Sequence, residues 1–493
     1  MRNIDYVRTR RKLSILAIAV TMFFTLFECR DVAACTTILV GKTLTADGSV
    51  ILGHNEDMGL TATGRLWPQQ ARSFKESVRI EVPYVSLQQP HRTYAYWASG
   101  NPKGSTGLGI DTQLHHYDSV LVGMNQWGVA MACNWAHSKE EAAPKKGIRR
   151  YAIRQLILER CTTAREAVKL IGNLIDEHGQ ADWGGLIYNV ADPNEAWVVE
   201  TTTHHWAARR VPDDSIHAVA NQFTIGDDFD LASQDLAQFA ETRGWYDPRH
   251  GKLSFRDAYG LPEKMNQPYD IDREARIHKL LDGKRGFIEP TDIFVVLRDR
   301  YEGTNKYTRP QQTPVWREDL DKDPSLSRTI SSNLCQSSSV AQLRGNLPVE
   351  VGAIMWYAMA NPDYSNYFPI YAGANRIPEA FSRQDGKRSP DSAWWLFKSL
   401  QLAGDRNYES FSPLVNNFWT AHHASATLQQ QRVEDKAISL IRDDRKDEAV
   451  ALLRTFTSNQ AQDALKHAQQ LLELQKPVRE GTVVEQQTTA THQ

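Results

Sequence analysis

Blocks of apolar residues separated by turn-forming residues predict a series of β-hairpins in the first half of the chain. The runs at 36–41 and 49–53 flank Thr45-Ala46-Asp47-Gly48, which is typical of a hairpin turn. Because both runs are nearly continuous in apolar residues, we expect this hairpin to be covered on both faces. Further strands are predicted at 119–124, 129–133, 186–190, 196–201 and 217–223.

Helical periodicity replaces the strand pattern between these hairpins. Helices are predicted over 149–160 and 164–177, and the second begins with a Thr163-x-x-Glu166 capping box and ends at Gly179. Hairpins interleaved with helices suit stacked antiparallel sheets with helices on the outside. The predicted fold class is therefore α+β, with four layers in the order αββα.

The composition changes near residue 425, where Gln, Asp, Lys and Ala become frequent and apolar residues keep helical spacing. We expect a main domain over 35–424 and a helical appendage over 425–475, broken at 443–447 and at 457–459. The appendage would pack against the main domain or form the contact of a homo-oligomer. Residues 476–493 are predicted to form a disordered tail.

The first 34 residues have the pattern of a signal peptide. Five basic residues precede Leu13–Phe27, in which 12 of 15 positions are apolar, and Val32-Ala33-Ala34 follows. That apolar run is shorter than the roughly 20 residues of a membrane-spanning helix, so no stable membrane anchor is expected. The prediction is cleavage after Ala34 and export to the periplasm or the extracellular space. Thr9–Leu13 also resembles a twin-arginine signal, which leaves the export route open between two systems.

Composition and charge exclude several classes of protein. The 493 residues include 57 Lys and Arg against 59 Asp and Glu, and loss of residues 1–34 moves the formal net charge from −2 to −5. This balance gives no support to nucleic-acid binding. With 5 Cys and no zinc-binding spacing, we expect neither a disulfide framework nor a metal or other cofactor. Three His-His pairs stand at 115/116, 204/205 and 422/423. They do not predict a metal site, because neighbours on a strand point to opposite faces and cannot bind one ion.

Cleavage after Ala34 would make Cys35 the first residue of the mature chain. Its own α-amine, with an ordinary pKa of about 8, then lies within reach of the thiol as a general base. Folding about the turn at 45–48 sets Cys35 opposite Asn55–Met58, beside the carboxylates of Glu56 and Asp57. A carboxylate there would hold the α-ammonium in place. The alternative is a lipobox at Val32–Cys35, which would give a lipid-anchored binding protein without catalysis.

Several motifs in order along the chain resemble those of the cysteine dipeptidases of the dipeptidase A family, a branch of the N-terminal nucleophile hydrolases. They are CTTILVGK at 35–42, ADGS at 46–49, GHNED at 53–57, GMNQWGVA at 123–130, ADPNEAWVVET at 191–201, RD at 298–299, YEGT at 301–304, QLR at 342–344 and SAWW at 392–395. The resemblance implies an αββα fold, a cysteine nucleophile exposed by processing, and hydrolysis of short peptides.

The resemblance also assigns roles to individual residues. Cys35 matches the nucleophile, Asp57 the aspartate that orients its amine, and Asn134 and Asn221 the side chains that line the oxyanion site. His54 stands where the family carries arginine, so activation of the thiol should be weaker or depend on pH near 6.5. A second arginine of the family corresponds loosely to Arg328.

The sequence thus predicts an exported cysteine dipeptidase that works through an acyl-enzyme. An amidase of the same fold acting on acyl-amino acids or penicillin-like amides remains the alternative enzyme, because the acyl pocket is not visible in the sequence. Cys133, Cys161 and Cys335 leave room for one disulfide, with its partners undetermined.

Overall fold

The computed structural model describes residues 35–475, apart from 59–62, 76–77, 83, 102–118, 142–145, 183, 311–327 and 384–387. The predicted signal peptide and the predicted C-terminal tail therefore lie outside the described residues. Within the described part, no helix combines the length and the apolar character needed to cross a membrane.

Two antiparallel sheets form the centre of the molecule. The six-stranded sheet has the order β14 (Ile216–Val219), β1 (Thr36–Val40), β2 (Val50–Asp57), β16 (Cys335–Leu343), β17 (Ala353–Met359) and β18 (Phe368–Tyr371). The eight-stranded sheet has the order β15 (Leu231–Ala232), β13 (Trp206–Val211), β12 (Ala196–Thr201), β11 (Gly185–Ala191), β10 (Ala130–Ala136), β9 (Val120–Asn125), β8 (Tyr96–Gly100) and β3 (Arg65–Gln69).

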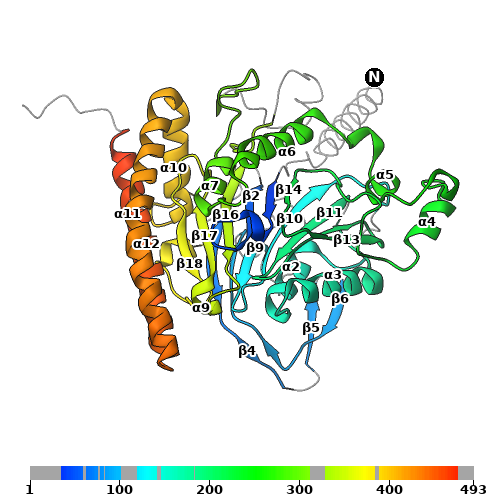
Figure 1. The fold of residues 1–493 in the computed structure, drawn as a ribbon, viewed down its shortest axis with the longest axis horizontal. Helices are drawn as coiled ribbons and strands as arrows, with labels where there is room; N and C mark the ends of the chain where they lie inside the picture. Colours follow the sequence, from blue (N-terminus) through cyan, green and yellow to red (C-terminus); the bar gives the residue numbers. More distant parts are fainter. Residues whose placement is uncertain are drawn as a thin grey trace, which may run out of the picture.

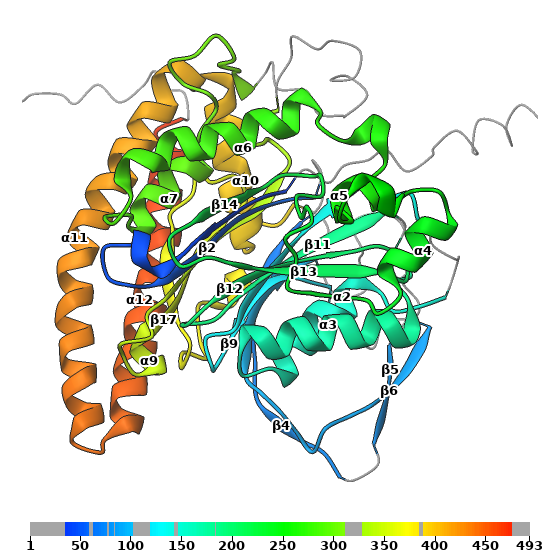
Figure 2. The same cartoon turned by 45° about the vertical axis from the view of Figure 1, so that its right-hand side comes forward.

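The sheets stack face to face, with helices on both outer surfaces (Figure 2). Leu39 and Leu52 of one sheet share a core with Ile187 and Val198 of the other. Helices α2 (Arg150–Arg160) and α3 (Ala164–His178) cover the eight-stranded sheet, and α6 (Pro268–Leu281) and α7 (Pro290–Leu297) cover the six-stranded one. This arrangement confirms the predicted α+β class with its αββα layers.

Smaller elements connect the layers. They are η1 (Lys42–Leu44), β4 (Arg72–Ser73), β5 (Arg79–Val82), β6 (Val85–Gln88), β7 (Arg92–Thr93), α4 (Leu236–Thr242), η3 (Pro248–His250), α5 (Phe255–Tyr259), η4 (Pro262–Lys264), η5 (Asp282–Lys284), α9 (Val349–Gly352) and η7 (Glu379–Phe381).

Local signals in the sequence explain how α3 is held against its sheet. The Thr163 hydroxyl accepts a hydrogen bond from the backbone N–H of Glu166 at 3.1 Å, and Gly179 ends the helix with a φ of 69°. Gly172 faces the sheet, where a Cβ would lie 2.3 Å from the Trp206 ring. Only glycine lets the helix approach this closely.

The first hairpin brings the start of β1 to the far end of β2. Thr36 pairs with Asn55 and Val40 with Ile51, so Cys35 faces Glu56. This register lies inside the expected range of Asn55–Met58. The connection is longer than a two-residue turn, because η1 forms between the strands and Gly48 takes a φ of 74°. On the other side, β16 pairs with β2 and closes the sheet around it.

Three helices at the C-terminal end of the described chain pack beside β17 and β18 (Figure 1). They are α10 (Ala393–Arg406), α11 (Tyr408–Arg442) and α12 (Lys446–Glu473). The break expected at 443–447 separates α11 from α12, whereas the break expected at 457–459 is wrong. There α12 continues, because Phe456 and Thr457 are buried against the sheet and favour an unbroken helix. The change in composition at 425 falls within α11.

Candidate active site

Cys35 lies at the start of β1 and is 2% exposed. Its Sγ is 3.6 Å from Oε1 of Glu56, and the backbone N–H of Asp57 points to the sulfur. Burial, together with the charges of Glu56 and Asp57, raises the pKa of the thiol well above its ordinary value. The sulfur is thus held as a neutral thiol, and a base beside it is needed to form the thiolate.

His54 and Glu56 form a buried pair on the same face of β2 as the cysteine. Nε2 of His54 lies 3.1 Å from Oε2 of Glu56, and Nδ1 lies 2.8 Å from the hydroxyl of Thr37. Burial favours the neutral acid, but the hydrogen bond from His54 and the charge of Arg154 hold the pKa of Glu56 below its ordinary value. The residue next to the sulfur is therefore an ionised Glu56, and the sequence analysis gave it no role of its own.

Asp57 points to the opposite face of β2, towards the helices. Neither of its carboxylate oxygens has a hydrogen-bond partner within 3.5 Å among the described residues, although Ser332 lies close enough to lower its pKa. Burial raises the pKa of Asp57 to about 7, against the opposing charges of Arg328 and Arg273. A buried carboxylate without a donor has room for a cationic hydrogen-bond partner.

Asn134 in β10 is fully buried and bound to the backbone of the nucleophile. Its Nδ2 donates to the carbonyl oxygens of Cys35 at 2.9 Å, Ala220 at 3.0 Å and Val219 at 3.3 Å. Its Oδ1 accepts a hydrogen bond from Thr37 at 2.6 Å. Both amide hydrogens thus face backbone carbonyls, and donation to an oxyanion would require Asn134 to exchange one of them.

Asn221 lies two residues beyond the end of β14 and has a simpler set of partners. Its Nδ2 donates to the carbonyl oxygen of Trp135 at 2.9 Å, and its Oδ1 accepts from Arg273 at 3.0 Å. No second acceptor for Nδ2 is found among the described residues, so one amide hydrogen remains for a substrate oxygen.

Arg273 of α6 joins the parts of the site, and the sequence analysis did not find it. The guanidinium donates to the carbonyl oxygen of Cys35 at 3.1 Å, to the hydroxyl of Thr36 at 3.0 Å and to Asn221. It also pairs with Asp270 at 2.6 Å, and both side chains are at most 1% exposed. The Asp270-x-x-Arg273 spacing in the sequence has the pattern of a surface ion pair, so no local signal marked it.

Arg328, the arginine chosen from the sequence, is also buried, and its charge acts on Asp57. Two buried arginines therefore lie near the carboxylate of Asp57, and Arg273 also donates a hydrogen bond to the carbonyl oxygen of Cys35.

All four cysteines in the described part of the chain, Cys35, Cys133, Cys161 and Cys335, are free and buried. The disulfide that the sequence left open is therefore not formed among them. Of the His-His pairs, 115/116 lies outside the described residues, while His205 contacts Glu140 and His423 contacts the carbonyl oxygen of Tyr367.

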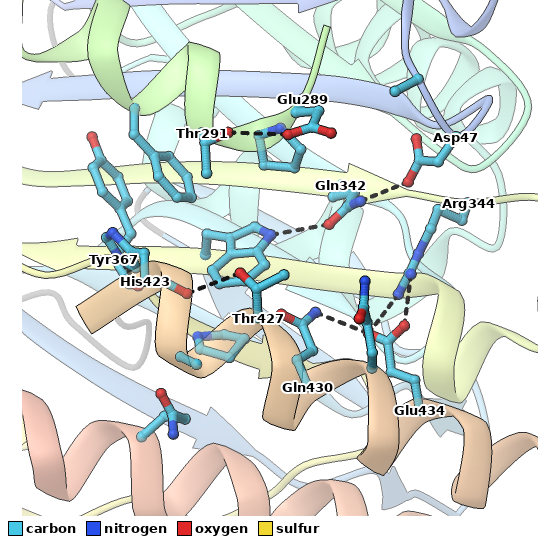
Figure 3. A pocket seen from close by; sticks show the side chains of 18 of the residues that line it. Asp47, Glu289, Thr291, Gln342, Arg344, Tyr367, His423, Thr427, Gln430 and Glu434 are labelled. Carbon is cyan, nitrogen blue, oxygen red and sulfur yellow. Dashed lines mark hydrogen bonds and ion pairs between the residues drawn. The ribbon is translucent and has the colours of Figure 1, made fainter. Parts of the chain in front are cut away.

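A separate cavity of about 210 Å³ lies between the six-stranded sheet and α11 (Figure 3). Its polar side chains bind one another: Gln342 donates to Asp47 at 2.7 Å, and Arg344 pairs with Glu434 at 2.8 Å. None of the predicted site residues lines this cavity.

A buried cysteine at the end of the first strand of stacked antiparallel sheets, with carboxylates, arginines and amides around it, defines a cysteine hydrolase of the αββα class. Residues 34–421 match the family model described as Peptidase family C69. The chain therefore belongs to peptidase family C69, which confirms the resemblance drawn from its motifs.

Relatives and one solved structure show how far the similarity extends. The chain is 29% identical over 398 residues to a "Probable dipeptidase" of Salmonella dublin, covering 73% of this chain and 84% of that protein. It is 24% identical over 404 residues to a "Probable dipeptidase" of Latilactobacillus sakei, covering 77% and 83%. The crystal structure of a cysteine-to-alanine mutant of the conjugated bile acid hydrolase from Clostridium perfringens covers 66% of this chain and 89% of its own, with 15% identity and a TM-score of 0.36.

Proposed function

We propose that this protein is an exported dipeptidase in which signal cleavage after Ala34 makes Cys35 an N-terminal nucleophile. Membership of peptidase family C69 and relatives named as dipeptidases support the substrate class of short peptides. The sequence Val32-Ala33-Ala34 directly before Cys35 supports the cleavage.

The observation that carries the proposal is the carboxylate of Asp57. It is buried, its charge acts on Cys35, and neither of its oxygens has a hydrogen-bond partner among the described residues. An α-ammonium at Cys35 would supply both the missing donor and the opposite charge. Asp57 would then hold the amine next to the sulfur, where it can act as a base.

Acylation follows from this arrangement. The α-amine takes the proton of the Cys35 thiol, and the thiolate attacks the carbonyl carbon of the dipeptide to form a C–S bond. Asn221 donates its remaining amide hydrogen to the oxyanion, and Asn134 and Arg273 hold Cys35 through its carbonyl oxygen. The α-ammonium returns the proton to the leaving amine as the C–N bond breaks.

Deacylation uses the same groups in reverse order. The α-amine takes a proton from water, the hydroxide attacks the thioester, and the C–S bond breaks to release the carboxylic acid. The thiolate recovers its proton from the α-ammonium, which restores the starting state.

The test is to express the full chain in a bacterial host with an export system and to recover the exported protein. We expect an N-terminal peptide mass that begins with unmodified Cys35, together with hydrolysis of dipeptides. Cys35→Ala should lower hydrolysis by at least about 10³-fold while the fold is kept, because no other group replaces the nucleophile. Cys161→Ala, which removes another buried free thiol, is the matched control and should keep its activity. A lipidated Cys35, or turnover by Cys35→Ala, would contradict the proposal.

A substrate panel separates the dipeptidase from an amidase of the same fold. Dipeptides and N-acyl amino acids are compared at equal concentration with the same exported protein. Higher kcat/KM for dipeptides supports the proposed substrate class, and the reverse order would replace it.

A further inference from the structure

We infer that Cys35, His54 and Glu56 form a binding site for a thiophilic divalent cation such as Zn²⁺, and that the bound ion blocks the nucleophile. The three residues bring together one sulfur, one imidazole nitrogen and one carboxylate oxygen, all within 4.8 Å of one another. Among the described residues this is the one group of three such side chains with that geometry. Binding depends only on these side chains, whereas the block of catalysis rests on the proposed function.

The ligand atoms lie close enough for side-chain rotation to bring them around one tetrahedral ion. Sγ of Cys35 is 3.6 Å from Oε1 of Glu56, and Nε2 of His54 is 3.1 Å from Oε2. Tetrahedral Zn²⁺ has bonds of about 2.3 Å to sulfur and about 2.0–2.1 Å to nitrogen and oxygen, which places its ligand atoms roughly 3.3–3.6 Å apart. The two distances run to different oxygens of Glu56, so side chains must rotate for one carboxylate oxygen, the sulfur and Nε2 to share one ion, starting from ligand atoms that all lie within 4.8 Å of one another.

The surrounding hydrogen bonds direct the correct nitrogen of His54 towards that centre. The hydroxyl of Thr37 donates to Oδ1 of Asn134 at 2.6 Å, so it accepts from Nδ1 of His54 at 2.8 Å. This assignment places a hydrogen on Nδ1 and points Nε2 at Glu56, so a cation that replaces the proton between Nε2 and Glu56 meets the lone pair of Nε2. A hydrogen bond to the second ring nitrogen is the usual support of a histidine that binds a metal.

Charge and burial favour an ion at this position. The side chains of His54 and Glu56 are at most 3% exposed, and Cys35 is 2% exposed. A thiolate and a carboxylate together carry two negative charges, so a divalent cation gives a neutral centre, which is the least costly state in a buried place. On binding, the ion displaces the proton of the thiol and the proton shared between His54 and Glu56. The positive charge of Arg154, which lies near enough to lower the pKa of Glu56, repels the cation.

Processing would add a fourth ligand. The α-amine of a mature Cys35 and its thiolate are attached to neighbouring carbon atoms, so both can bind one ion in a five-membered chelate ring. Four ligands complete the tetrahedron and leave no open position for a water or a substrate. The same amine and sulfur are then unavailable for proton transfer and attack.

Cobalt provides a direct test of the ligands, because Co²⁺ bound to a thiolate gives a charge-transfer absorption band that free Co²⁺ lacks. We expect the band when the full chain is titrated with Co²⁺, and its loss in Cys35→Ser. His54→Gln and Glu56→Gln should each weaken Co²⁺ binding at least tenfold, and circular dichroism shows whether each variant is folded. Cys133→Ala and Cys161→Ala, which remove other buried thiols, should keep the band and the affinity. A band that survives in Cys35→Ser, or unchanged affinity in both glutamine variants, would overturn the site.

Inhibition is measured separately on the exported, processed protein. Zn²⁺ should inhibit dipeptide hydrolysis, and a chelator should restore it. His54→Gln should require at least tenfold more Zn²⁺ for half inhibition, with each variant compared to its own rate without metal. If Co²⁺ binds as expected but Zn²⁺ does not inhibit, the block is overturned. If the protein hydrolyses no dipeptide, the proposed function fails, and the cobalt band still decides the metal site.

Discussion

Arg273→Met tests whether one buried guanidinium supports both the fold and the nucleophile. The side chain contacts the carbonyl oxygen of Cys35, the hydroxyl of Thr36 and Oδ1 of Asn221, and it pairs with Asp270 at 2.6 Å. Methionine keeps much of the volume but removes every donor. The substitution therefore separates the charge and hydrogen bonds of Arg273 from its packing.

The expected loss of stability follows from the burial of the pair. Asp270 is 0% exposed, so Arg273→Met leaves a buried carboxylate without its guanidinium. Breaking a buried ion pair from one side costs about 3–5 kcal/mol, and Asp270→Asn should cost a similar amount. In the double variant no charge remains unpaired, so its loss should be smaller than the sum of the two single losses by at least about 2 kcal/mol.

Urea unfolding of the three variants and the unchanged protein measures these free energies, and dipeptide hydrolysis measures the effect on the site. Arg273→Met should lower kcat strongly, because Cys35 and Asn221 lose a shared partner. Asp270→Asn keeps the bonds from Arg273 to both residues and should lower kcat much less at a comparable loss of stability. Additive free energies, or equal losses of kcat in the two single variants, would refute the reasoning.

Three further predictions concern other parts of the structure. Asn221→Ala should lower kcat about 10²–10³-fold with little change in KM, as expected when an oxyanion donor is removed; a change in KM alone would contradict this role. Burial raises the pKa of Glu200 from its ordinary value of about 4.5 to about 7. The folded protein should therefore lose stability as the pH rises from about 4.5 to about 7, because the buried carboxyl must ionise. Between those pH values the unfolding free energy should fall by up to about 3 kcal/mol more than in Glu200→Gln. Urea unfolding at several pH values measures this, and the same pH dependence in both proteins would contradict it. Gly172→Ala should lower the unfolding free energy by about 1–3 kcal/mol, since the added Cβ would lie 2.3 Å from the Trp206 ring. Gly283→Ala is the control: its Cβ would meet no atom within 4 Å, so it should be nearly neutral in the same unfolding assay.

The parts of the fold that depend on local sequence could be predicted. Apolar runs with turn residues marked the paired strands β1 and β2, β9 and β10, and β11 and β12, and the Thr163 cap and Gly179 marked the ends of α3. The hairpin register placed Cys35 opposite Glu56 within the expected range. These features depend on residues close together in the chain, so pattern and propensity suffice for them.

Contacts between distant segments could not be predicted in the same way. Asn134 binds the carbonyl oxygen of Cys35 across 99 positions, and Arg273 binds it across 238. The residues of the site therefore meet only after the sheets stack and α6 covers one of them. His54 illustrates the limit, because the sequence showed an unusual residue but not its contacts with Thr37 and Glu56.

The alternation of side chains along β2 explains why one strand can serve two tasks. His54 and Glu56 face the other sheet, next to Sγ of Cys35, whereas Asn55 and Asp57 face the helices. A slip of one residue would exchange the two sets and place Asp57 on the wrong face. Pairing of β2 with both β1 and β16 opposes such a slip, because both ladders would have to shift together. Pairing of β16 with β2 therefore helps to fix which carboxylate meets the sulfur of Cys35 and which one faces the helices.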